Sequence, residues 1–350
     1  MPSQIHNLMV YTNFAKNVLL SNIKRLSFPY KLTFAVTYLC NSRCQICRIW
    51  KRKKEKELTK EKIKDFFETN NKFNWIDLTG GEIFLKEDLV QITESIVKNC
   101  ENLYLLHFPT NGFLTEKILA DTKKILELSP HRMIVTVSLD GPEELHDELR
   151  GVRGGWKKTI ETFQQLKKLK KKNFEVYFGM TLSKYNSGKI DNTIKEVKLL
   201  IPDISYNDFH LNIAQTSAHF YKNVGMNLGI DDQIIGSVKK FRGKRKKKFS
   251  GVHFLEDRYL KLISEYIKKD KVPLACQSLS ASVFIDPQGN VYPCAIWDKK
   301  IANLENYDFD LKKIWDLNKV KKIRKKIIHG SCPGCWTPCE AYQTILGNLM

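Results

Sequence analysis

The sequence contains no long hydrophobic run. Nowhere do about 18 apolar residues follow one another, the length that a helix needs to cross a bilayer, so no membrane-spanning helix is expected. The N-terminal segment also lacks the cationic start, the apolar core and the small-residue cleavage site of a secretory signal. These absences favour a cytoplasmic protein, whose reducing surroundings keep cysteines as free thiols.

Several common catalytic motifs are missing as well. The chain has no G-x-S-x-G, no G-x4-G-K-S/T and no H-E-x-x-H, so nothing indicates a serine hydrolase, a P-loop nucleotidase or a zincin. Cysteine is scarce: nine residues in 350 are too few, and odd in number, for a small secreted disulfide scaffold. With 42% hydrophobic and 27% charged residues, the composition is that of a folded globular protein.

Charge of one sign dominates. Lys and Arg number 58 against 38 Asp and Glu, which gives a net charge of +20. The basic residues are densest in three runs, at 51–54, 167–172 and 244–248. Such runs are usually solvated helix faces, and nucleic-acid binding would require them to be gathered on one face.

From residue 31 to about 222, short apolar segments alternate with amphipathic helical segments. The predicted strands cover residues 31–38, 75–81, 103–108, 133–141, 174–182 and 209–215. Strands that are apolar almost throughout and are joined by helices are typical of a buried parallel sheet. Six such units, against the eight of a closed barrel, predict an α/β fold with a partial (β/α)6 TIM-like barrel. Histidines on or near these strands (His107, His210 and His219) are expected to be structural.

The remaining segments flank this core. Residues 1–30 predict an amphipathic helix that packs on the main domain or lies on a membrane surface. Its expected apolar face consists of Ile5, Leu8, Met9, Phe14, Val18, Leu19 and Ile23. Residues 223–270 are predicted to form a linker and a basic helical segment. Residues 271–350 predict a small cysteine-rich α+β domain with a hairpin over 282–294, one helix over 311–328 and a cysteine-dense turn at 331–342.

Three cysteines follow the first predicted strand with the spacing C-x3-C-x2-C: Cys40, Cys44 and Cys47. One loop with three thiols can occupy three corners of a metal cluster, and no fourth cysteine or histidine lies nearby in sequence. A structural zinc ion takes four protein ligands, and a cubane iron–sulfur cluster normally takes four cysteines. Three ligands therefore imply a metal centre with one open coordination position.

The stretch CNSRCQIC at residues 40–47 resembles the signature of the radical S-adenosylmethionine (SAM) enzymes. Further stretches at later strand ends resemble that family's motifs in the family's order: Gly80-Gly81-Glu82, Thr110-Asn111-Gly112, Ser138-Leu139-Asp140-Gly141 and His146-Asp147 with Arg150-Gly151. The resemblance covers about residues 31–220. It departs from the pattern at Ile46, where the family often has an aromatic residue, and at Ile83, where a proline commonly stands.

The resemblance implies that Cys40, Cys44 and Cys47 bind a 4Fe-4S cluster whose open iron binds SAM. It also implies that Gly80, Gly81 and Glu82 meet the amino group of SAM, because glycine lets the backbone approach a ligand and a carboxylate accepts hydrogen bonds from an ammonium. The other candidates for SAM binding are Ser138, Asn111 and Asp140, of which the last two also fit a purely turn-shaping role. No residue is assigned to catalysis on the substrate.

A second cysteine set resembles the short form of the C-terminal auxiliary iron–sulfur (SPASM/twitch-like) extension of this family: Cys276, Cys294, Cys332, Cys335 and Cys339. Five cysteines suffice for one auxiliary 4Fe-4S cluster, and the predicted ligands are the first four, with Cys339 as a spare. A structural zinc knot is the alternative for this set. Cys100 is expected to be a buried thiol without a role.

The resemblance implies an enzyme that cleaves SAM reductively and uses the 5′-deoxyadenosyl radical to abstract hydrogen from a substrate. A flavodoxin- or ferredoxin-like protein would donate the electron, and the positive charge would attract this acidic donor, while nucleic acid is not an expected partner. The substrate is left open among small molecules, sugars, nucleotides, lipid-linked compounds and peptides. The 39 residues before Cys40 are few for a leader-binding domain, which favours a non-peptide. A zinc-containing, basic nucleic-acid-binding protein without catalysis is the alternative function.

Overall fold

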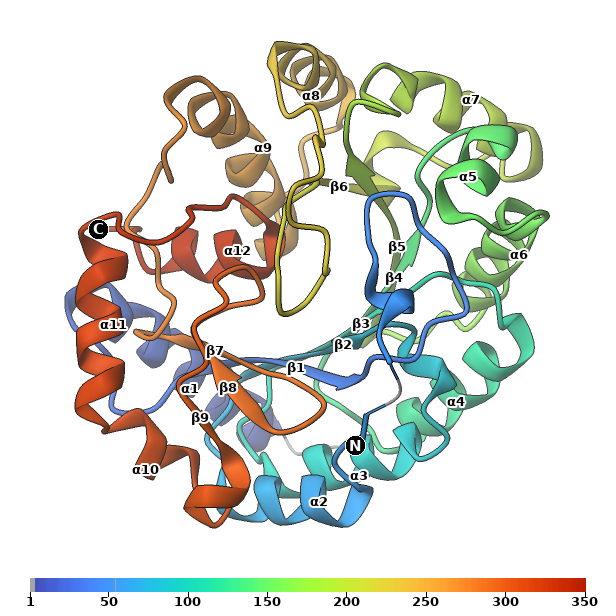
Figure 1. Cartoon of the computed structure of the whole chain (residues 1–350). Helices are drawn as coiled ribbons and strands as arrows, with labels where there is room; N and C mark the ends of the chain where they lie inside the picture. The colour runs from blue at the N-terminus through green and yellow to red at the C-terminus, as the bar shows by residue number, and fades with distance from the viewer. Residues whose placement is uncertain (1–3, 54) are drawn as a thin grey trace.

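The computed structural model describes residues 4–53 and 55–350. The first three residues of the predicted N-terminal helix, the side chain of Ile5 and Lys54 of the first basic run lie outside the described part. The centre of the molecule is a nine-stranded sheet in the order β6-β5-β4-β3-β2-β1-β7-β8-β9. Its curvature, with helices on the outside, is visible in Figure 1.

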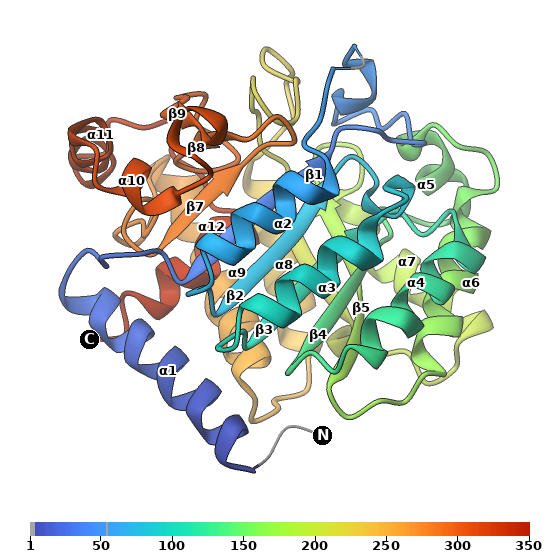
Figure 2. The same cartoon turned by 90° about the horizontal axis from the view of Figure 1, so that it is seen from below.

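All six predicted barrel strands are present, and each pairs in parallel with the next. They are β1 (Lys31–Thr37), β2 (Trp75–Gly80), β3 (Leu105–Thr110), β4 (Met133–Ser138), β5 (Phe174–Leu182) and β6 (Phe209–Ile213). The connecting helices cover the outer face of the sheet (Figures 1 and 2): α2 (Lys60–Thr69), α3 (Leu89–Asn99), α4 (Thr115–Glu127), α5 (Glu143–Arg150), α6 (Gly155–Lys167) and α7 (Ile190–Leu200). The predicted partial barrel is confirmed. Short 3₁₀ turns lie at Ile49–Lys51, Ile83–Leu85, Ser187–Lys189, Tyr206–Asp208 and Leu304–Tyr307.

Helix α2 illustrates why these segments fold as they do. The Thr59 side chain caps the helix by accepting a hydrogen bond from the Lys62 amide. Ile63, Phe66 and Phe67 recur at helical spacing and are fully buried against the sheet. Burying each of these side chains contributes about 1.5–3 kcal/mol, so the apolar stripe holds the helix on the barrel.

The C-terminal segment continues the barrel sheet. The predicted hairpin is present as β7 (Ser282–Ile285) and β8 (Asn290–Tyr292), followed by the short β9 (Ala302–Asn303). Strand β7 pairs in parallel with β1, which would otherwise be the edge strand of the barrel sheet. Because β7 satisfies the free edge of β1, the cysteine-rich segment is joined to the barrel by backbone hydrogen bonds.

Helical structure in the C-terminal third differs from the prediction. The single helix expected over 311–328 is two helices, α10 (Leu311–Trp315) and α11 (Asn318–Ile328), because Leu317 between them takes an extended ψ of 140°. The cysteine-dense turn leads into α12 (Pro338–Leu346), which has proline in its first turn, where no amide hydrogen is needed. The region 223–270, predicted as a linker and a basic helical segment, holds two long helices, α8 (Asp232–Lys244) and α9 (Gly251–Lys269).

The first helix, α1 (Gln4–Ile23), does not have the single apolar face that the sequence predicts. Val18 and Phe14 turn toward the amino ends of the strands, whereas the apolar side chains of Leu8, Met9, Leu19 and Ile23 are exposed. Part of the inward face is polar, because the side-chain amide of Asn17 donates from Nδ2 to Asn74 Oδ1 at 2.7 Å. No helix within the described ranges is long and apolar enough to cross a membrane.

One buried ion pair joins the first strand, the second strand and the last helix. Lys31 at the start of β1 is fully buried, and its ammonium lies 3.1 Å from Asp77 Oδ2 and 2.9 Å from Gln343 Oε1 of α12. Burial opposes ionisation of Asp77, but the Lys31 ammonium and the His107 hydrogen bond outweigh it and hold the pKa of Asp77 below its usual range. The pair therefore exists in its charged form at neutral pH.

Replacing Lys31 with methionine tests this junction. The change Lys31→Met leaves the Asp77 carboxylate buried without its ammonium partner, so we expect a loss of about 3–5 kcal/mol in the free energy of unfolding. The double variant Lys31→Met/Asp77→Asn removes both charges and should recover part of that loss in urea unfolding. Equal stability of the single and double variants would contradict the assignment.

Candidate active site

The interior of the partial barrel holds a cavity of about 460 Å³. It is lined at the carboxyl ends of the strands by the loop after β1, and at the amino ends by residues of α1, α9 and α12. A closed barrel fills this space with branched apolar side chains. Small and polar residues occupy many of the inward positions here: Thr33, Thr79, Thr136, Ser138, Gly179 and Thr181.

The predicted thiol ligands Cys40, Cys44 and Cys47 all line this cavity, and all three are free thiols. Their loop is fixed on the end of α5, because the Arg43 amide donates to the Arg150 carbonyl and the Gln45 amide to the Leu149 carbonyl, both at 2.8 Å. Burial raises the pKa of the Cys40 and Cys47 thiols to about 12. Three thiols on one cavity wall form a donor set that suits iron–sulfur ligation.

Gly80 and Gly81 also line the cavity and touch the cysteine loop backbone to backbone. A side chain at Gly80, whose φ is +154°, would place its Cβ 2.1 Å from the Thr37 carbonyl oxygen, and at Gly81 the same distance separates a Cβ from the Leu39 oxygen. The Gly81 amide donates to the Thr37 carbonyl at 2.9 Å. Only glycine allows this approach, which fixes the chain directly before Cys40.

Glu82 lies beside the cavity and does not line it. Its carboxylate is buried and accepts hydrogen bonds from Thr110 Oγ1 at 2.9 Å and the Asn111 amide at 2.7 Å. Burial, partly offset by these hydrogen bonds, raises the pKa of Glu82 to about 7. The structure therefore shows Glu82 joining the ends of β2 and β3, and its contact with the ammonium of SAM stays a prediction.

The remaining predicted SAM-binding residues, Asn111, Ser138 and Asp140, line the cavity. Asn111 donates from its side chain to Asn41 Oδ1 at 2.6 Å, which ties the end of β3 to the cysteine loop. Asp140 accepts from the Thr181 amide at 2.8 Å and forms an ion pair with Arg150. Asp140 thus ties the end of β5 to α5 at the mouth of the barrel, and the contacts of all three residues with SAM stay predictions.

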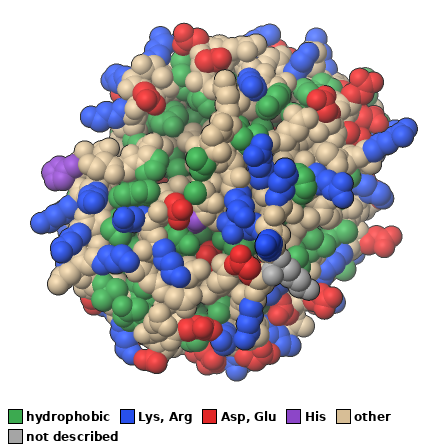
Figure 3. Space-filling model, viewed as in Figure 1, with side chains coloured by type: hydrophobic (Ala, Val, Ile, Leu, Met, Phe, Trp, Pro, Cys, Tyr) green, Lys and Arg blue, Asp and Glu red, His purple; other side chains and the backbone are tan. Residues whose placement is uncertain are grey.

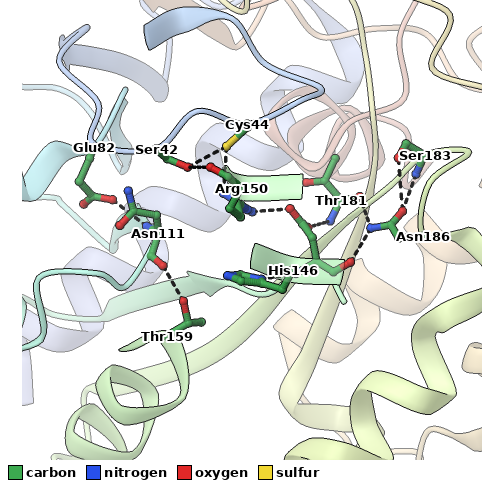
Figure 4. A network of polar contacts seen from close by, with 11 residues as sticks. Ser42, Cys44, Glu82, Asn111, His146, Arg150, Thr159, Thr181, Ser183 and Asn186 are labelled. Carbon is green, nitrogen blue, oxygen red and sulfur yellow. Dashed lines mark hydrogen bonds and ion pairs between the residues drawn. The ribbon is translucent and has the colours of Figure 1, made fainter. Parts of the chain in front are cut away.

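Arg150 is a site residue to which the sequence assigned no role. Its guanidinium lies 2.7 Å from Asp140 Oδ2 and 3.9 Å from Cys44 Sγ, and Ser42 Oγ lies 3.0 Å from the same sulfur (Figure 4). Burial disfavours the charge, but Asp140 and the Cys44 thiol outweigh it and raise the pKa of Arg150 above its usual value. Arg150 therefore places a positive charge beside the loop that carries the predicted cluster ligands.

Deeper in the cavity, a polar chain crosses three strands. Asp77 Oδ1 lies 3.2 Å from His107 Nδ1, and His107 Nε2 lies 2.9 Å from Thr136 Oγ1. All three residues line the cavity. His210, which also lines it, stacks on the Tyr177 ring at 4.1 Å. His107 and His210 therefore face the cavity, and the alternation of inward positions along the strands was the signal for this.

The C-terminal cysteines divide between two cavities. A second, much smaller hollow is lined by Cys276, Cys294, Cys332 and Cys335, whereas Cys339 lines the large cavity. Four thiols around one hollow suit an iron–sulfur cluster. No three His, Cys, Asp or Glu side chains in the described part of the chain converge on one metal-ion position. Cys100 is buried in the core, as predicted.

Tyr221 lines the large cavity, as Cys47 and Cys339 do. Its carbonyl accepts a hydrogen bond from the Arg48 amide at 2.9 Å, just after Cys47. Burial, reinforced by Cys339, Cys47 and Cys335, raises the pKa of its phenol well above the usual value. One cavity therefore brings together Tyr221 and cysteines of both sets.

Comparison with known proteins agrees with this arrangement. Residues 34–197 match the model of the radical SAM superfamily, and residues 276–336 match that of the SPASM iron–sulfur cluster-binding domain. The chain is 25% identical, over 81% of its length, to the antilisterial bacteriocin subtilosin biosynthesis protein AlbA of Bacillus subtilis (strain 168). It is 28% identical, over 48% of its length, to the sporulation killing factor maturation protein SkfB of the same organism. It spans 58% of AlbA and 39% of SkfB.

Among solved structures, Streptococcus suis SuiB bound to its precursor peptide SuiA shares the fold. The TM-score is 0.60 at 15% sequence identity, with 93% of this chain and 75% of SuiB covered. With the two matched family models, the fold and the two thiol sets lead to one assignment. The chain therefore combines a radical SAM superfamily domain with a C-terminal SPASM iron–sulfur cluster-binding domain.

Proposed function

We propose that this enzyme cleaves SAM reductively at a 4Fe-4S cluster held by Cys40, Cys44 and Cys47, and that its substrate is a peptide. The observation that carries the proposal is that these three thiols share one cavity wall with Gly80 and Gly81, at the carboxyl ends of the strands. When bound, the cluster and SAM supply a 5′-deoxyadenosyl radical that takes a hydrogen atom from the substrate.

The chain itself contributes position, charge and exclusion of water. Arg150 holds positive charge against Cys44, and the absence of side chains at Gly80 and Gly81 lets the backbone before Cys40 pack directly on the end of β2. Ser138 offers a hydroxyl at the mouth of the cavity. Below it, the His107 imidazole is held between Asp77 Oδ1 at Nδ1 and Thr136 Oγ1 at Nε2, which fixes its orientation in the cavity.

The peptide assignment draws on the relatives. AlbA is named for bacteriocin biosynthesis, SkfB for maturation of a killing factor, and the SuiB structure contains a precursor peptide. A cavity of about 460 Å³ is of ligand-binding size and would admit one side chain of a peptide whose remainder stays outside. This proposal departs from the non-peptide expectation of the sequence analysis.

The acidic electron donor also stays a prediction. Lys and Arg side chains, which would attract such a donor, are spread over the face seen in Figure 3.

For the second thiol set, we propose that Cys276, Cys294, Cys332 and Cys335 hold one auxiliary 4Fe-4S cluster and that Cys339 takes no part. The small hollow supports this proposal, because the four proposed ligands line it and Cys339 does not. The domain ranges 31–222, 223–270 and 271–350 stay predictions alongside this assignment.

SAM cleavage is tested with Cys44→Ala. The anaerobically reconstituted variant should release no 5′-deoxyadenosine from SAM under reduction, because one ligand of the SAM-binding cluster is gone. Cys100→Ala, which removes a buried thiol outside both cavities, should release it at the wild-type rate. Release that persists in Cys44→Ala would overturn the proposed site.

The substrate class is tested separately, by deuterium transfer from labelled candidate peptides into 5′-deoxyadenosine. Transfer from a nucleotide or a sugar instead would show that the substrate is not a peptide.

Iron content tests the ligand partition. Two cubane clusters predict about eight irons per chain in the wild type, and Cys294→Ser should lose about half of them. Cys339→Ser should keep the full complement and the same visible absorbance. A colourless wild-type protein with stoichiometric zinc would instead support the zinc alternative, and loss of iron in Cys339→Ser would show that this residue is a ligand.

The close contact at Gly81 predicts a third effect. In Gly81→Ala the new Cβ would overlap the Leu39 carbonyl oxygen, so the loop that carries Cys40 must move. We expect at least a twofold loss of iron after reconstitution and a lower midpoint of thermal unfolding, because a strained backbone of this kind costs about 1–3 kcal/mol. Gly236→Ala, at an uncrowded position of α8, should keep the wild-type iron content and unfold at a midpoint no lower than the wild type, because alanine favours a helix over glycine.

A further inference from the structure

Two of the three basic runs meet at the amino ends of the strands. The runs are 167–172, at the end of α6, and 244–248, between α8 and α9. The Lys167 ammonium lies 2.9 Å from Asp208 Oδ1, and the Lys246 amide donates to Asn207 Oδ1 at 2.8 Å. Since Asn207 and Asp208 are adjacent, the two runs lie side by side on what we call the amino-end face.

Exposed apolar side chains lie on the same face. Phe249 directly follows the second basic run and is fully exposed, and Phe254 is exposed one helical turn further along. Helix α1 adjoins them, because its Phe14 and the Val252 side chain of α9 pack against one apolar cluster. Figure 2 shows α1 at the opposite end of the barrel from the loop after β1.

The outward side of α1 extends this apolar surface. Leu8, Leu19 and Ile23 are 64%, 53% and 74% exposed and recur on one stripe of the helix. The helix contains no Asp or Glu, and its one lysine is Lys16. A helix with an apolar outer stripe is unusual on a surface in contact with water alone.

The charges of the amino-end face are free to meet a polyanion. Lys246, Lys247 and Lys248 are exposed, and none of them forms an ion pair within the residues that the structure describes. The seven residues from 244 to 250 include no Asp or Glu. The surface therefore combines unpaired lysines with exposed phenylalanine and aliphatic side chains.

We propose that the amino-end face docks on an anionic lipid bilayer, with the lysines at the headgroups and with Phe249 and the outer stripe of α1 in the interfacial layer. Basic residues and apolar side chains together provide the two signals that stable membrane attachment requires. Nucleic acid would use the lysines but leave Phe249 and α1 in water, which is why the lipid surface is favoured.

The cavity is oriented so that docking on the amino-end face would leave the cysteine loop accessible from the aqueous phase. At its amino end the lining includes the apolar side chains of Phe14, Val252, Phe254 and Leu346 together with the charged Arg132, whereas the cysteine loop lies at the other end. Docking on this face would turn the amino end of the cavity toward the lipid. The mouth with Cys40, Cys44 and Cys47 would then face the aqueous phase, open to substrate and electron donor.

Vesicle co-sedimentation of the full chain tests the proposal. We expect binding to vesicles of phosphatidylcholine mixed with phosphatidylglycerol, little binding to phosphatidylcholine alone, and weakening by salt. Lys246→Gln/Lys247→Gln/Lys248→Gln should lower the partition coefficient about 100-fold, at about 1 kcal/mol per lysine. Phe249→Ser should lower it about tenfold, the order expected for losing one inserted aromatic side chain.

Matched controls lie on α11, on another side of the molecule. Lys321→Gln/Lys322→Gln/Lys325→Gln removes the same charge, and Ile328→Ser removes an apolar side chain that is 62% exposed. Both should bind vesicles like the wild type. All variants should release 5′-deoxyadenosine normally, because none of these residues lines either cavity. A failure of docking is thereby distinguished from a failure of the proposed chemistry.

Four outcomes would overturn the proposal. The first is the absence of binding to the anionic vesicles, and the second is equal weakening by the control variants. The third is binding unaffected by Phe249→Ser together with lysine-dependent binding of an oligonucleotide duplex, which would identify nucleic acid as the partner. The fourth is saturable binding of a protein that is lost on changing Leu19 or Ile23 to serine, with no lipid binding.

Discussion

The position of β1 between β2 and β7 is the constraint on which both thiol sets depend. All seven residues of the strand are buried, and its two edges are hydrogen-bonded to parallel neighbours. The chain leaves its carboxyl end straight into the loop with Cys40, while β7 leads into the hairpin that ends at Cys294. Displacing β1 would therefore move the proposed SAM-binding cluster and the proposed auxiliary cluster together. This shared strand explains how the C-terminal segment is held against the barrel, where Cys339 lines the same cavity as Cys40, Cys44 and Cys47.

The start of β1 provides a second connection. Lys31 places a charge inside the barrel, where Asp77 neutralises it and α12 accepts its hydrogen bonds. Asp77 also orients His107, so the ion pair that fastens the last helix to the first strand also positions an imidazole in the cavity. Buried ion pairs are weak contributors to stability but fix geometry strongly when every partner is satisfied. A polar interior of this kind keeps the barrel open where apolar residues would fill it.

Local sequence patterns predicted the six strands, the hairpin and the cysteine sets, because apolar runs, turn residues and cysteine spacing act over short distances. What the sequence missed depends on contacts between distant segments. Arg150 lies 106 positions beyond Cys44, and only the fold brings its guanidinium to that sulfur. Glu82 accepts hydrogen bonds from the end of β3, 28 and 29 positions further along the chain, which no local pattern indicates. Cys339 stands four residues after Cys335, but the start of α12 turns it toward the other cavity.

The surface on which the basic runs meet likewise depends on contacts between segments that are distant in sequence. Each basic run is, by sequence, an ordinary solvated stretch, and no local pattern indicates that two of them adjoin. Their meeting follows from barrel topology: the end of α6 and the turn after α8 both lie at the amino ends of the strands, where the segment before β6 contacts each. Helix α1 reaches the same end because its inward face binds Asn74 just before β2. The apolar residues left on its outer side then adjoin lysines that are far away in sequence. The fold thus places the cysteine loop at the carboxyl ends of the strands and a basic surface with exposed apolar side chains at the amino ends.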